Sequence, residues 1–292
     1  MRILLINPAF PYTGKDKFPL GIAYLAALAR DMGNHVTVVD ENVGDVVPWA
    51  EVGNFALIGL SVTTPAFSRA KELVATMRGT NAVRGTIVAG GHHPTFCPEE
   101  VLSAGVDVVL RGEGDATFPQ LVEALGSDAA ATPLDVIPGI SYVTDTGEIH
   151  HNALPDLLPD LTGVPFPAWD LFRYANYVPM SVITSRGCPY RCSYCAAAAF
   201  WQHSIRFRQV PDVISELDAM LSLFPYPFVK FQDSVFTLHR RRTTELLESF
   251  IAREYPFRWT CETRVDALDA ELIDLMAEAK CKTIMLGVES GS

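Results

Sequence analysis

Three closely spaced cysteines constrain this sequence more than any other feature. Cys188, Cys192 and Cys195 stand in the segment Ser185-Arg-Gly-Cys-Pro-Tyr-Arg-Cys-Ser-Tyr-Cys195, with the spacing C-x3-C-x2-C. Three thiolates on one loop can hold three irons of a [4Fe–4S] cluster, which leaves the fourth iron without a protein ligand. An open iron can bind a substrate or a cofactor, so this spacing favours a chemical reaction over electron storage.

Structural zinc, a disulfide and simple packing are the alternatives for these cysteines. A structural zinc site has four ligands, often in two C-x2-C pairs, and here only one C-x2-C is present. A disulfide is disfavoured because the N-terminus has no secretory pattern and the chain is expected to be cytoplasmic. The remaining cysteines, Cys97, Cys261 and Cys281, are scattered and are expected to be small buried hydrophobic side chains. The cluster is the favoured interpretation, and zinc is its main competitor.

Length and charge exclude several classes of protein. The 292 residues suffice for two domains, and the 49% hydrophobic content argues against disorder. No apolar run is long enough to span a membrane. The net charge of −11 disfavours nonspecific binding to nucleic acid. The one basic run, His239–Arg242, is expected to be the solvated start of a helix, with contact to an anionic substrate as the alternative.

The first 125 residues alternate between strand-like and helix-like patterns. Short apolar runs that end in turn residues are typical of buried parallel strands, and apolar residues at helical spacing predict helices. The expected strands are Arg2–Asn7, His35–Asp40, Leu57–Val62, Thr86–Ala89 and Val106–Leu110, and the expected helices are Leu20–Met32, Phe67–Arg78, Pro98–Ala104 and Thr117–Leu125. This alternation predicts an α/β fold with a doubly wound, Rossmann-like parallel sheet.

Three loops after strands of this sheet are rich in glycine and small polar residues. They are Ser61-Val-Thr-Thr64, Gly90-Gly-His-His93 and Gly112-Glu-Gly114. Doubly wound sheets bind ligands beyond the carboxyl ends of their strands, so together these loops are expected to form a floor for a large flat cofactor. The alternative for each loop alone is that its glycines only permit a tight turn.

The first half resembles the cobalamin-binding domain that precedes the radical S-adenosylmethionine (SAM) domain in one large subfamily. The matching segments are Asn7-Pro8, Pro19-Leu-Gly-Ile-Ala-Tyr-Leu-Ala-Ala-Leu28, Asp40, Ser61-Val-Thr63, Gly90-Gly-His92, Pro94-Thr95 and Gly112-Glu-Gly114. The resemblance implies cobalamin as a cofactor, with Ser61, Thr63 and the Gly90-Gly91 loop in contact with it. No G-x-G-x-x-G follows the first strand, so the usual nicotinamide or flavin fingerprint is missing.

The D-x-H-x-x-G motif that places a histidine under cobalt in other cobalamin proteins is absent, because Asp31 and His35 have the wrong spacing. His92 and His93 would lie near the corrin, but a loop histidine after two glycines is more often a hydrogen-bonding or packing group than a metal ligand. The candidate cofactor-binding residues of this half are Ser61, Thr63, Gly90, Gly91, His92, Gly112 and Glu113.

The cysteine loop resembles the signature of the radical SAM superfamily, which has an aromatic residue before the last cysteine. Tyr194 occupies that place. The resemblance implies a [4Fe–4S] cluster on Cys188, Cys192 and Cys195, with SAM as a further cofactor whose amine and carboxylate chelate the open iron.

Charge suggests which side chains would contact SAM. Arg264 would pair with its carboxylate, and Tyr194 would offer an aromatic edge to its adenine. Asp233, Glu262 or Glu289 would bind the amine or the ribose hydroxyls of SAM. The alternative for each of these carboxylates is a salt bridge or a helix cap at the end of a strand.

The second half shows βα repetition, as in a parallel barrel. The expected helices are Val210–Phe224, Arg241–Arg253 and Asp269–Ala279, and the expected strands are Phe228–Gln232, Arg258–Thr263 and Thr283–Gly287. The superfamily's partial barrel has six βα units, whereas this sequence has three and the start of a fourth. A fragment of a longer protein and a truncated gene product both remain open.

A proline-rich connection separates the two halves. It follows a hairpin expected from Ser141–Thr144 and Glu148–His150, and its prolines should keep it extended and stiff. Pro165-Phe-Pro-Ala-Trp-Asp170 resembles the linker of the same subfamily. The expected domains are a cobalamin-binding domain at 1–150, a linker at 151–178 and the N-terminal part of a radical SAM partial barrel at 179–292.

The resemblance implies an enzyme that cleaves SAM reductively to a 5′-deoxyadenosyl radical and transfers a methyl group to an unactivated carbon. A cyclase or rearrangement enzyme acting on a tetrapyrrole or natural product is the first alternative. A noncatalytic corrinoid-binding protein with a truncated barrel is the second, and a methylthiotransferase is disfavoured because the first half contains only Cys97. The expected partners are a small-molecule substrate and an electron donor such as flavodoxin or ferredoxin.

Overall fold

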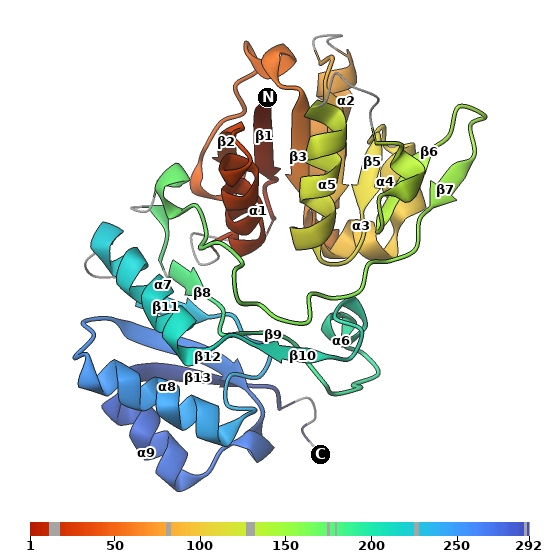
Figure 1. Ribbon diagram of the computed structural model, residues 1–292. Helices are drawn as coiled ribbons and strands as arrows, with labels where there is room; N and C mark the ends of the chain where they lie inside the picture. The colour runs from red at the N-terminus through yellow and green to blue at the C-terminus, as the bar shows by residue number, and fades with distance from the viewer. Residues whose placement is uncertain are drawn as a thin grey trace. The chain divides into compact units, whose positions relative to one another are not determined.

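The chain forms two compact units in the computed structural model (Figure 1). The structure describes residues 1–11, 18–79, 83–126, 132–173, 176–178, 180–224, 228–288 and 291. The first unit comprises Met1–Gly14, Pro19–Leu158 and Val164–Phe172, and the second comprises Lys15–Phe18, Pro159–Gly163 and Arg173–Ser292. Each unit contains its own sheet.

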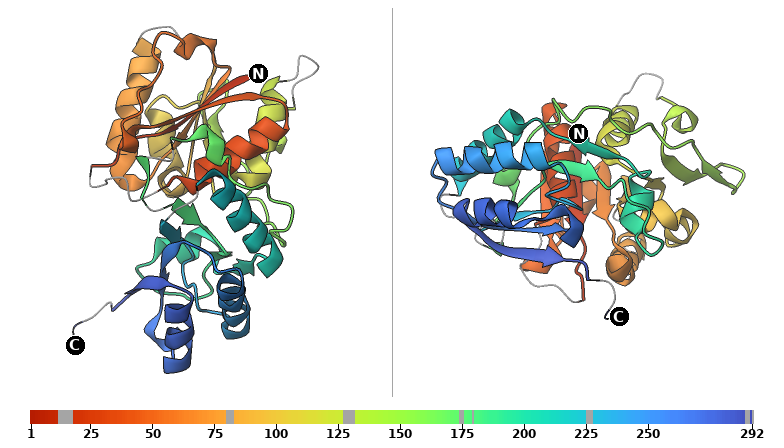
Figure 2. Two further views of the ribbon diagram at one scale, coloured as in Figure 1. Left: turned by 90° about the vertical axis from the view of Figure 1, so that its left-hand side faces the viewer. Right: turned by 90° about the horizontal axis from the view of Figure 1, so that it is seen from below.

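The first unit is built on a sheet of seven strands in the order β2-β1-β3-β4-β5-β6-β7. The strands are β1 (Arg2–Asn7), β2 (His35–Asp40), β3 (Leu57–Ser61), β4 (Thr86–Gly90), β5 (Val108–Leu110), β6 (Ile140–Val143) and β7 (Ile149–His151). The first five are parallel, whereas β6 and β7 form an antiparallel hairpin that projects from the edge of the sheet (Figure 2). The order 2-1-3-4-5 is a doubly wound arrangement, in which the order of strands reverses between β1 and β3.

Helices cover both faces of this sheet, as the predicted alternation requires. They are α1 (Leu20–Asp31), α2 (Phe67–Gly79), α3 (His92–Phe96), α4 (Pro98–Ser103) and α5 (Gly114–Gly126). Helices α1 and α5 pack against each other. Apolar side chains of α2 and α4 share one buried core with side chains of the strands, which places these two helices on a common face of the sheet. The doubly wound α/β fold predicted from the sequence is therefore confirmed.

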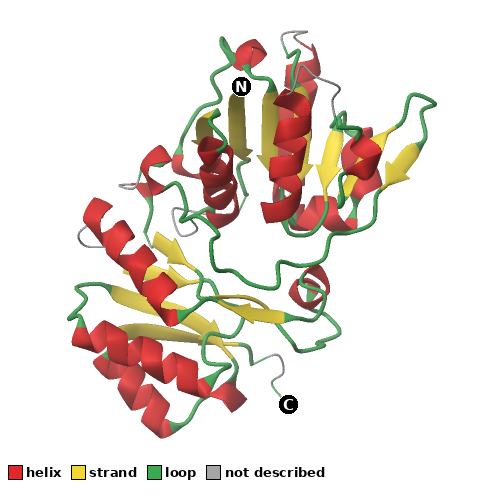
Figure 3. Ribbon diagram, viewed as in Figure 1, coloured by secondary structure: helices red, strands yellow, loops and turns green. Residues whose placement is uncertain are grey.

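The second unit contains a parallel sheet in the order β13-β12-β11-β8, with helices between consecutive strands (Figure 3). Its strands are β8 (Met180–Val182), β11 (Phe228–Phe231), β12 (Arg258–Thr263) and β13 (Cys281–Leu286), and its main helices are α7 (Val210–Leu223), α8 (Arg240–Ala252) and α9 (Ala270–Glu278). Asp269 caps α9, since its carboxylate accepts the N–H of Leu272 at 2.8 Å. The incomplete parallel βα arrangement predicted for the second half is confirmed.

Two local predictions need correction. His92 and His93 were expected in a loop, but the short helix α3 begins at His92, directly after Gly91. Between β8 and α7 the structure adds an antiparallel pair, β9 (Ser185–Gly187) with β10 (Ile205–Phe207), and the helix α6 (Ala196–Phe200). These elements are only three to five residues long, which is too short for apolar periodicity to reveal them.

Candidate functional site

The cysteine loop begins directly after β9 and ends at α6. Cys188 follows Gly187, the last residue of β9, and Cys195 precedes the first residue of α6. The N–H of Cys195 donates a hydrogen bond to the carbonyl oxygen of Cys192 at 3.1 Å, which folds the last cysteines into a turn. All three cysteines are free and partly exposed. Three accessible thiols on one loop are a donor set that fits three irons of a [4Fe–4S] cluster.

Gly187 fixes the start of this loop. Its φ is +101°, a backbone conformation that side chains with a Cβ rarely adopt. It also pairs with Ile205 of β10, so a Cβ at this position would overlap the backbone oxygen of Ser204. The direction in which the chain leaves β9 toward Cys188 therefore depends on glycine at position 187.

Asp233 anchors the segment that leads into the cysteine loop. Its carboxylate is 1% exposed and accepts hydrogen bonds from the N–H of Thr184 at 3.0 Å, the hydroxyl of Thr184 at 2.8 Å and the hydroxyl of Ser185. Burial raises the pKa of Asp233, while these hydrogen bonds and the charge of Arg242 oppose that rise. The guanidinium of Arg242 donates to the hydroxyl and the carbonyl oxygen of Thr184 at 3.1 Å and 2.9 Å.

Replacing Asp233 with alanine should lower the free energy of unfolding by about 3 kcal/mol or more, because three buried donors would lose their acceptor. Chemical denaturation of the purified chain measures this change. Asp233→Asn is the matched variant, since it keeps one acceptor oxygen and should lose less. Equal stability of the alanine variant and the parent chain would show that Asp233 does not anchor this segment.

Two further predicted SAM contacts of the second unit, Glu262 and Arg264, lie at or beside β12. Glu262 is in β12 and forms an ion pair with Lys230, with 2.9 Å between Oε1 and Nζ. Arg264 directly follows β12, and its guanidinium donates two hydrogen bonds to the carboxylate of Asp266 at 2.9 Å and 2.7 Å. Its Cζ lies over the ring of Tyr190, 4.0 Å from the ring centroid.

Tyr190 lies inside the cysteine loop, so Arg264 is held against that loop. This contact has no local signal in the sequence, because the two residues are 74 positions apart in the chain. Tyr194 is 66% exposed. The predicted site residue Glu289 lies outside the residues that the structure describes.

The predicted cofactor-binding residues of the first unit gather at one edge of its sheet. Ser61 is the last residue of β3 and pairs with Gly90, the last residue of β4. Thr63 lies in the loop directly after β3. Gly112 and Glu113 lie in the loop after β5, which is the neighbour of β4 in the sheet. This is the carboxyl edge of the parallel strands, where doubly wound sheets bind ligands.

Small residues shape this edge. Gly91 has a φ of +105°, and a Cβ there would lie 2.9 Å from the carbonyl oxygen of Val62. Gly112 has a φ of +78°, and its N–H donates to the hydroxyl of Thr95 at 2.9 Å. Burial lowers the pKa of His92, which favours its neutral form. A row of small residues at this edge fits the approach of a large, flat cofactor.

The fold, the cysteine loop and the carboxyl edge of the first unit's sheet together define the class of protein. A doubly wound α/β unit precedes a parallel βα unit that carries a three-cysteine loop. In keeping with that division, a family model for the B12 binding domain matches residues 12–122, and one for the radical SAM superfamily matches residues 182–292.

Two curated relatives align along the whole chain. An uncharacterized methyltransferase of Pyrococcus horikoshii is 28% identical over 310 aligned residues, which cover 100% of this chain and 66% of the relative. The anaerobic magnesium-protoporphyrin IX monomethyl ester cyclase of Rubrivivax gelatinosus is 26% identical over 313 residues, which cover 100% of this chain and 56% of the relative. The chain thus spans between about half and two thirds of the length of these relatives.

A solved structure shares the fold of the whole chain. The cobalamin-dependent S-adenosylmethionine radical enzyme OxsB, determined with aqua-cobalamin bound, superposes with a TM-score of 0.81 at 23% identity and covers 100% of this chain and 44% of its own. The chain thus combines a B12 binding domain with a domain of the radical SAM superfamily. Within the described residues, no helix is both long and apolar enough to cross a membrane.

Proposed function

We propose that this chain binds a [4Fe–4S] cluster, SAM and cobalamin and forms the cofactor-binding part of a methyltransferase. The observation that carries the proposal is the loop with three free, partly exposed cysteines in a chain whose other unit is a doubly wound sheet. When bound, these groups supply reductive cleavage of SAM to a 5′-deoxyadenosyl radical and transfer of a methyl group to an unactivated carbon.

Cys188, Cys192 and Cys195 would hold the cluster. The turn between Cys192 and Cys195 and the antiparallel pairing of β9 with β10 support this role, because they constrain the backbone at both ends of the loop. The protein's task is to hold three thiolates in place and to leave the fourth iron open.

Four side chains would line the SAM site, and a fifth, Asp233, would support it. Tyr194 is exposed on the cysteine loop, and Arg264 stacks on that loop through Tyr190, so both are close to the cluster ligands in the fold. The carboxylate of Glu262 is half exposed beside Lys230 and would accept a hydrogen bond from a ribose hydroxyl or the amine of SAM. Asp233 would act through Thr184 and Ser185, which it holds at the start of the loop. Glu289 completes the set proposed from the sequence.

Cobalamin would lie against the carboxyl edge of the first unit's sheet. Ser61, Thr63, Gly90, Gly91, His92, Gly112 and Glu113 are the residues proposed to contact it. The positive φ angles of Gly91 and Gly112 support this assignment, because glycine there lets the backbone approach a ligand closely.

Each of three consecutive segments has its own proposed function. Residues 1–150 would bind cobalamin, 151–178 would link, and 179–292 would bind the cluster and SAM. The substrate would be a small molecule, and an electron donor such as flavodoxin or ferredoxin would reduce the cluster in the cytoplasm.

A cyclase or rearrangement activity on a tetrapyrrole or natural product is the second candidate. The match to a cyclase of Rubrivivax gelatinosus along the whole chain favours keeping it. Both candidates use the same cluster, SAM and corrinoid, so the assignments above hold for either.

Anaerobic reconstitution with iron and sulfide, followed by addition of hydroxocobalamin, SAM and a reductant, tests the proposal. We expect about four irons per chain, retained corrin absorption after gel filtration, and formation of 5′-deoxyadenosine. Zinc in place of iron would refute the cluster. Iron without retained corrin would refute the cobalamin assignment, and retained corrin without 5′-deoxyadenosine would indicate a carrier in place of an enzyme.

A further inference from the structure

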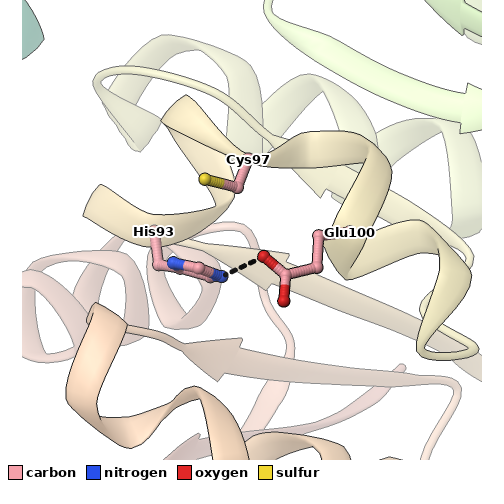
Figure 4. A group of neighbouring side chains, drawn as sticks. All are labelled: His93, Cys97 and Glu100. Carbon is pink, nitrogen blue, oxygen red and sulfur yellow. Dashed lines mark ion pairs between the residues drawn. The ribbon is translucent and has the colours of Figure 1, made fainter.

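A second group of metal-binding side chains lies in the first unit, outside the cysteine loop. His93, Cys97 and Glu100 bring one nitrogen, one sulfur and one carboxylate oxygen within 4.8 Å of one another (Figure 4). His93 is in α3, Cys97 lies between α3 and α4, and Glu100 is in the first turn of α4. The spacing H-x3-C-x2-E places the three side chains on one side of the α3–α4 corner.

The imidazole of His93 is held on several sides. It is 6% exposed, its ring lies 4.3 Å from the ring of Phe67 between centroids, and its backbone N–H donates to Val62 at 3.2 Å. Nδ1 lies 3.3 Å from the hydroxyl oxygen of Thr64. An N–H at Nδ1 that donates to Thr64 would leave the lone pair on Nε2, which is the arrangement that a metal ligand requires.

Nε2 of His93 is buried and has no hydrogen-bond partner among the described residues. It lies 3.6 Å from Oε2 of Glu100, which is beyond a hydrogen bond. Ligand atoms around a tetrahedral zinc ion are roughly 3.3 to 3.6 Å apart, given zinc bonds of about 2.0 to 2.3 Å. The separation of this histidine nitrogen and this carboxylate oxygen therefore suits two ligands of one ion.

The corner between α3 and α4 positions the sulfur. The N–H of Cys97 donates to the carbonyl oxygen of His93 at 2.9 Å, and the carbonyl oxygen of Cys97 accepts from Val101 at 3.3 Å. Cys97 is partly buried and free. Its place is thus fixed by the ends of both helices, with the histidine one turn before it and the carboxylate in the turn after it.

We propose that His93, Cys97 and Glu100 bind one divalent transition-metal ion, with zinc as the best match to a nitrogen, sulfur and oxygen donor set. A water molecule would complete the tetrahedron. This site is separate from the cluster and goes beyond the proposed function. It would tie α3 to α4 directly after the Gly90-Gly91 edge. The sequence alone favoured a packing or hydrogen-bonding role for His93, and the buried, unpartnered Nε2 is the observation that changes this interpretation.

Cobalt titration of the full chain tests the site. The starting protein is the variant with Cys188, Cys192 and Cys195 replaced by alanine, which removes the three thiols of the cysteine loop. We expect one equivalent of Co²⁺ to produce a thiolate-to-cobalt absorption band and one equivalent of Zn²⁺ to displace it. Cys97→Ala should abolish the band. His93→Gln should weaken the site so that one equivalent of Co²⁺ no longer saturates it. Thr64→Val should weaken Co²⁺ binding by about 10- to 100-fold.

Glu100→Gln and Glu99→Gln form a matched pair for the same titration. Glu99 is the neighbouring residue and lies 3.1 Å from His151, outside the proposed site. Affinity should fall in Glu100→Gln and stay unchanged in Glu99→Gln. A starting protein without a thiolate band, or a band of equal strength in Cys97→Ala, would overturn the proposal.

Alkylation of the chain with its cysteine loop intact provides a second measurement that does not depend on the triple variant. Mass spectrometry should show that Zn²⁺ slows modification of Cys97 while Cys281 is modified at the same rate. In His93→Gln the protection should disappear. Equal rates for Cys97 with and without Zn²⁺ would count against the site.

Discussion

Replacing Cys192 with alanine is expected to abolish both the [4Fe–4S] cluster and the formation of 5′-deoxyadenosine. Cys192 is the middle ligand of the proposed three, and its carbonyl oxygen accepts the N–H of Cys195 in the turn that closes the loop. Alanine keeps that backbone contact and removes only the thiol, so the loss would report on the ligand. Iron analysis and electron paramagnetic resonance of the reduced protein measure the cluster, and chromatography measures 5′-deoxyadenosine.

Cys281→Ala is the control for Cys192→Ala. Cys281 is partly buried in β13, away from the loop in sequence, and is not among the proposed ligands. Its replacement should leave about four irons per chain. If Cys192→Ala retained the parent's iron content and spectrum, the assignment of the loop as the cluster site would be wrong.

Gly187→Ala is expected to disrupt the cluster site without removing a ligand. The backbone at φ +101° would be strained by about 1–3 kcal/mol with any Cβ, and the new methyl group would also overlap the backbone oxygen of Ser204. The total cost should be about 3 kcal/mol or more, because backbone atoms cannot move aside as a flexible side chain can. We expect lower stability in chemical denaturation and less iron bound after reconstitution.

Gly163→Ala is the matched control for this substitution. Gly163 also has a positive φ, +85°, but nothing lies within 4 Å of the position that its Cβ would occupy. It should therefore lose only the conformational part, about 1–2 kcal/mol, and keep its iron. Equal losses in the two variants would show that the clash with Ser204 has no effect on the loop.

The regular elements of both units were predictable from the sequence because buried parallel strands and amphipathic helices have strong periodic patterns. Leu57–Val62 and Arg258–Thr263, for example, correspond to β3 and β12 within one residue. The cysteine loop was equally predictable, since its spacing is local. These signals needed no knowledge of which strands become neighbours.

Contacts between distant segments were not predictable in the same way. Asp233 was expected to contact SAM by charge, and only the pairing of β8 with β11 shows that it binds Thr184 and Ser185. The stacking of Arg264 on Tyr190 likewise depends on the fold. Contacts such as these arise from strand pairing and register, which composition and spacing do not encode. The group of His93, Cys97 and Glu100 is different, because its members are close in the chain. It was missed because His93 was expected in a loop, whereas the corner between α3 and α4 brings the three side chains together.

The three-cysteine loop is proposed to hold a [4Fe–4S] cluster with one iron open to SAM. Electron paramagnetic resonance of the reconstituted, reduced chain, recorded before and after SAM is added to the same sample, tests this most directly. We predict a cluster signal whose shape changes when SAM coordinates the open iron. A chain that binds zinc in place of iron, or a cluster signal that SAM leaves unchanged, would contradict the account.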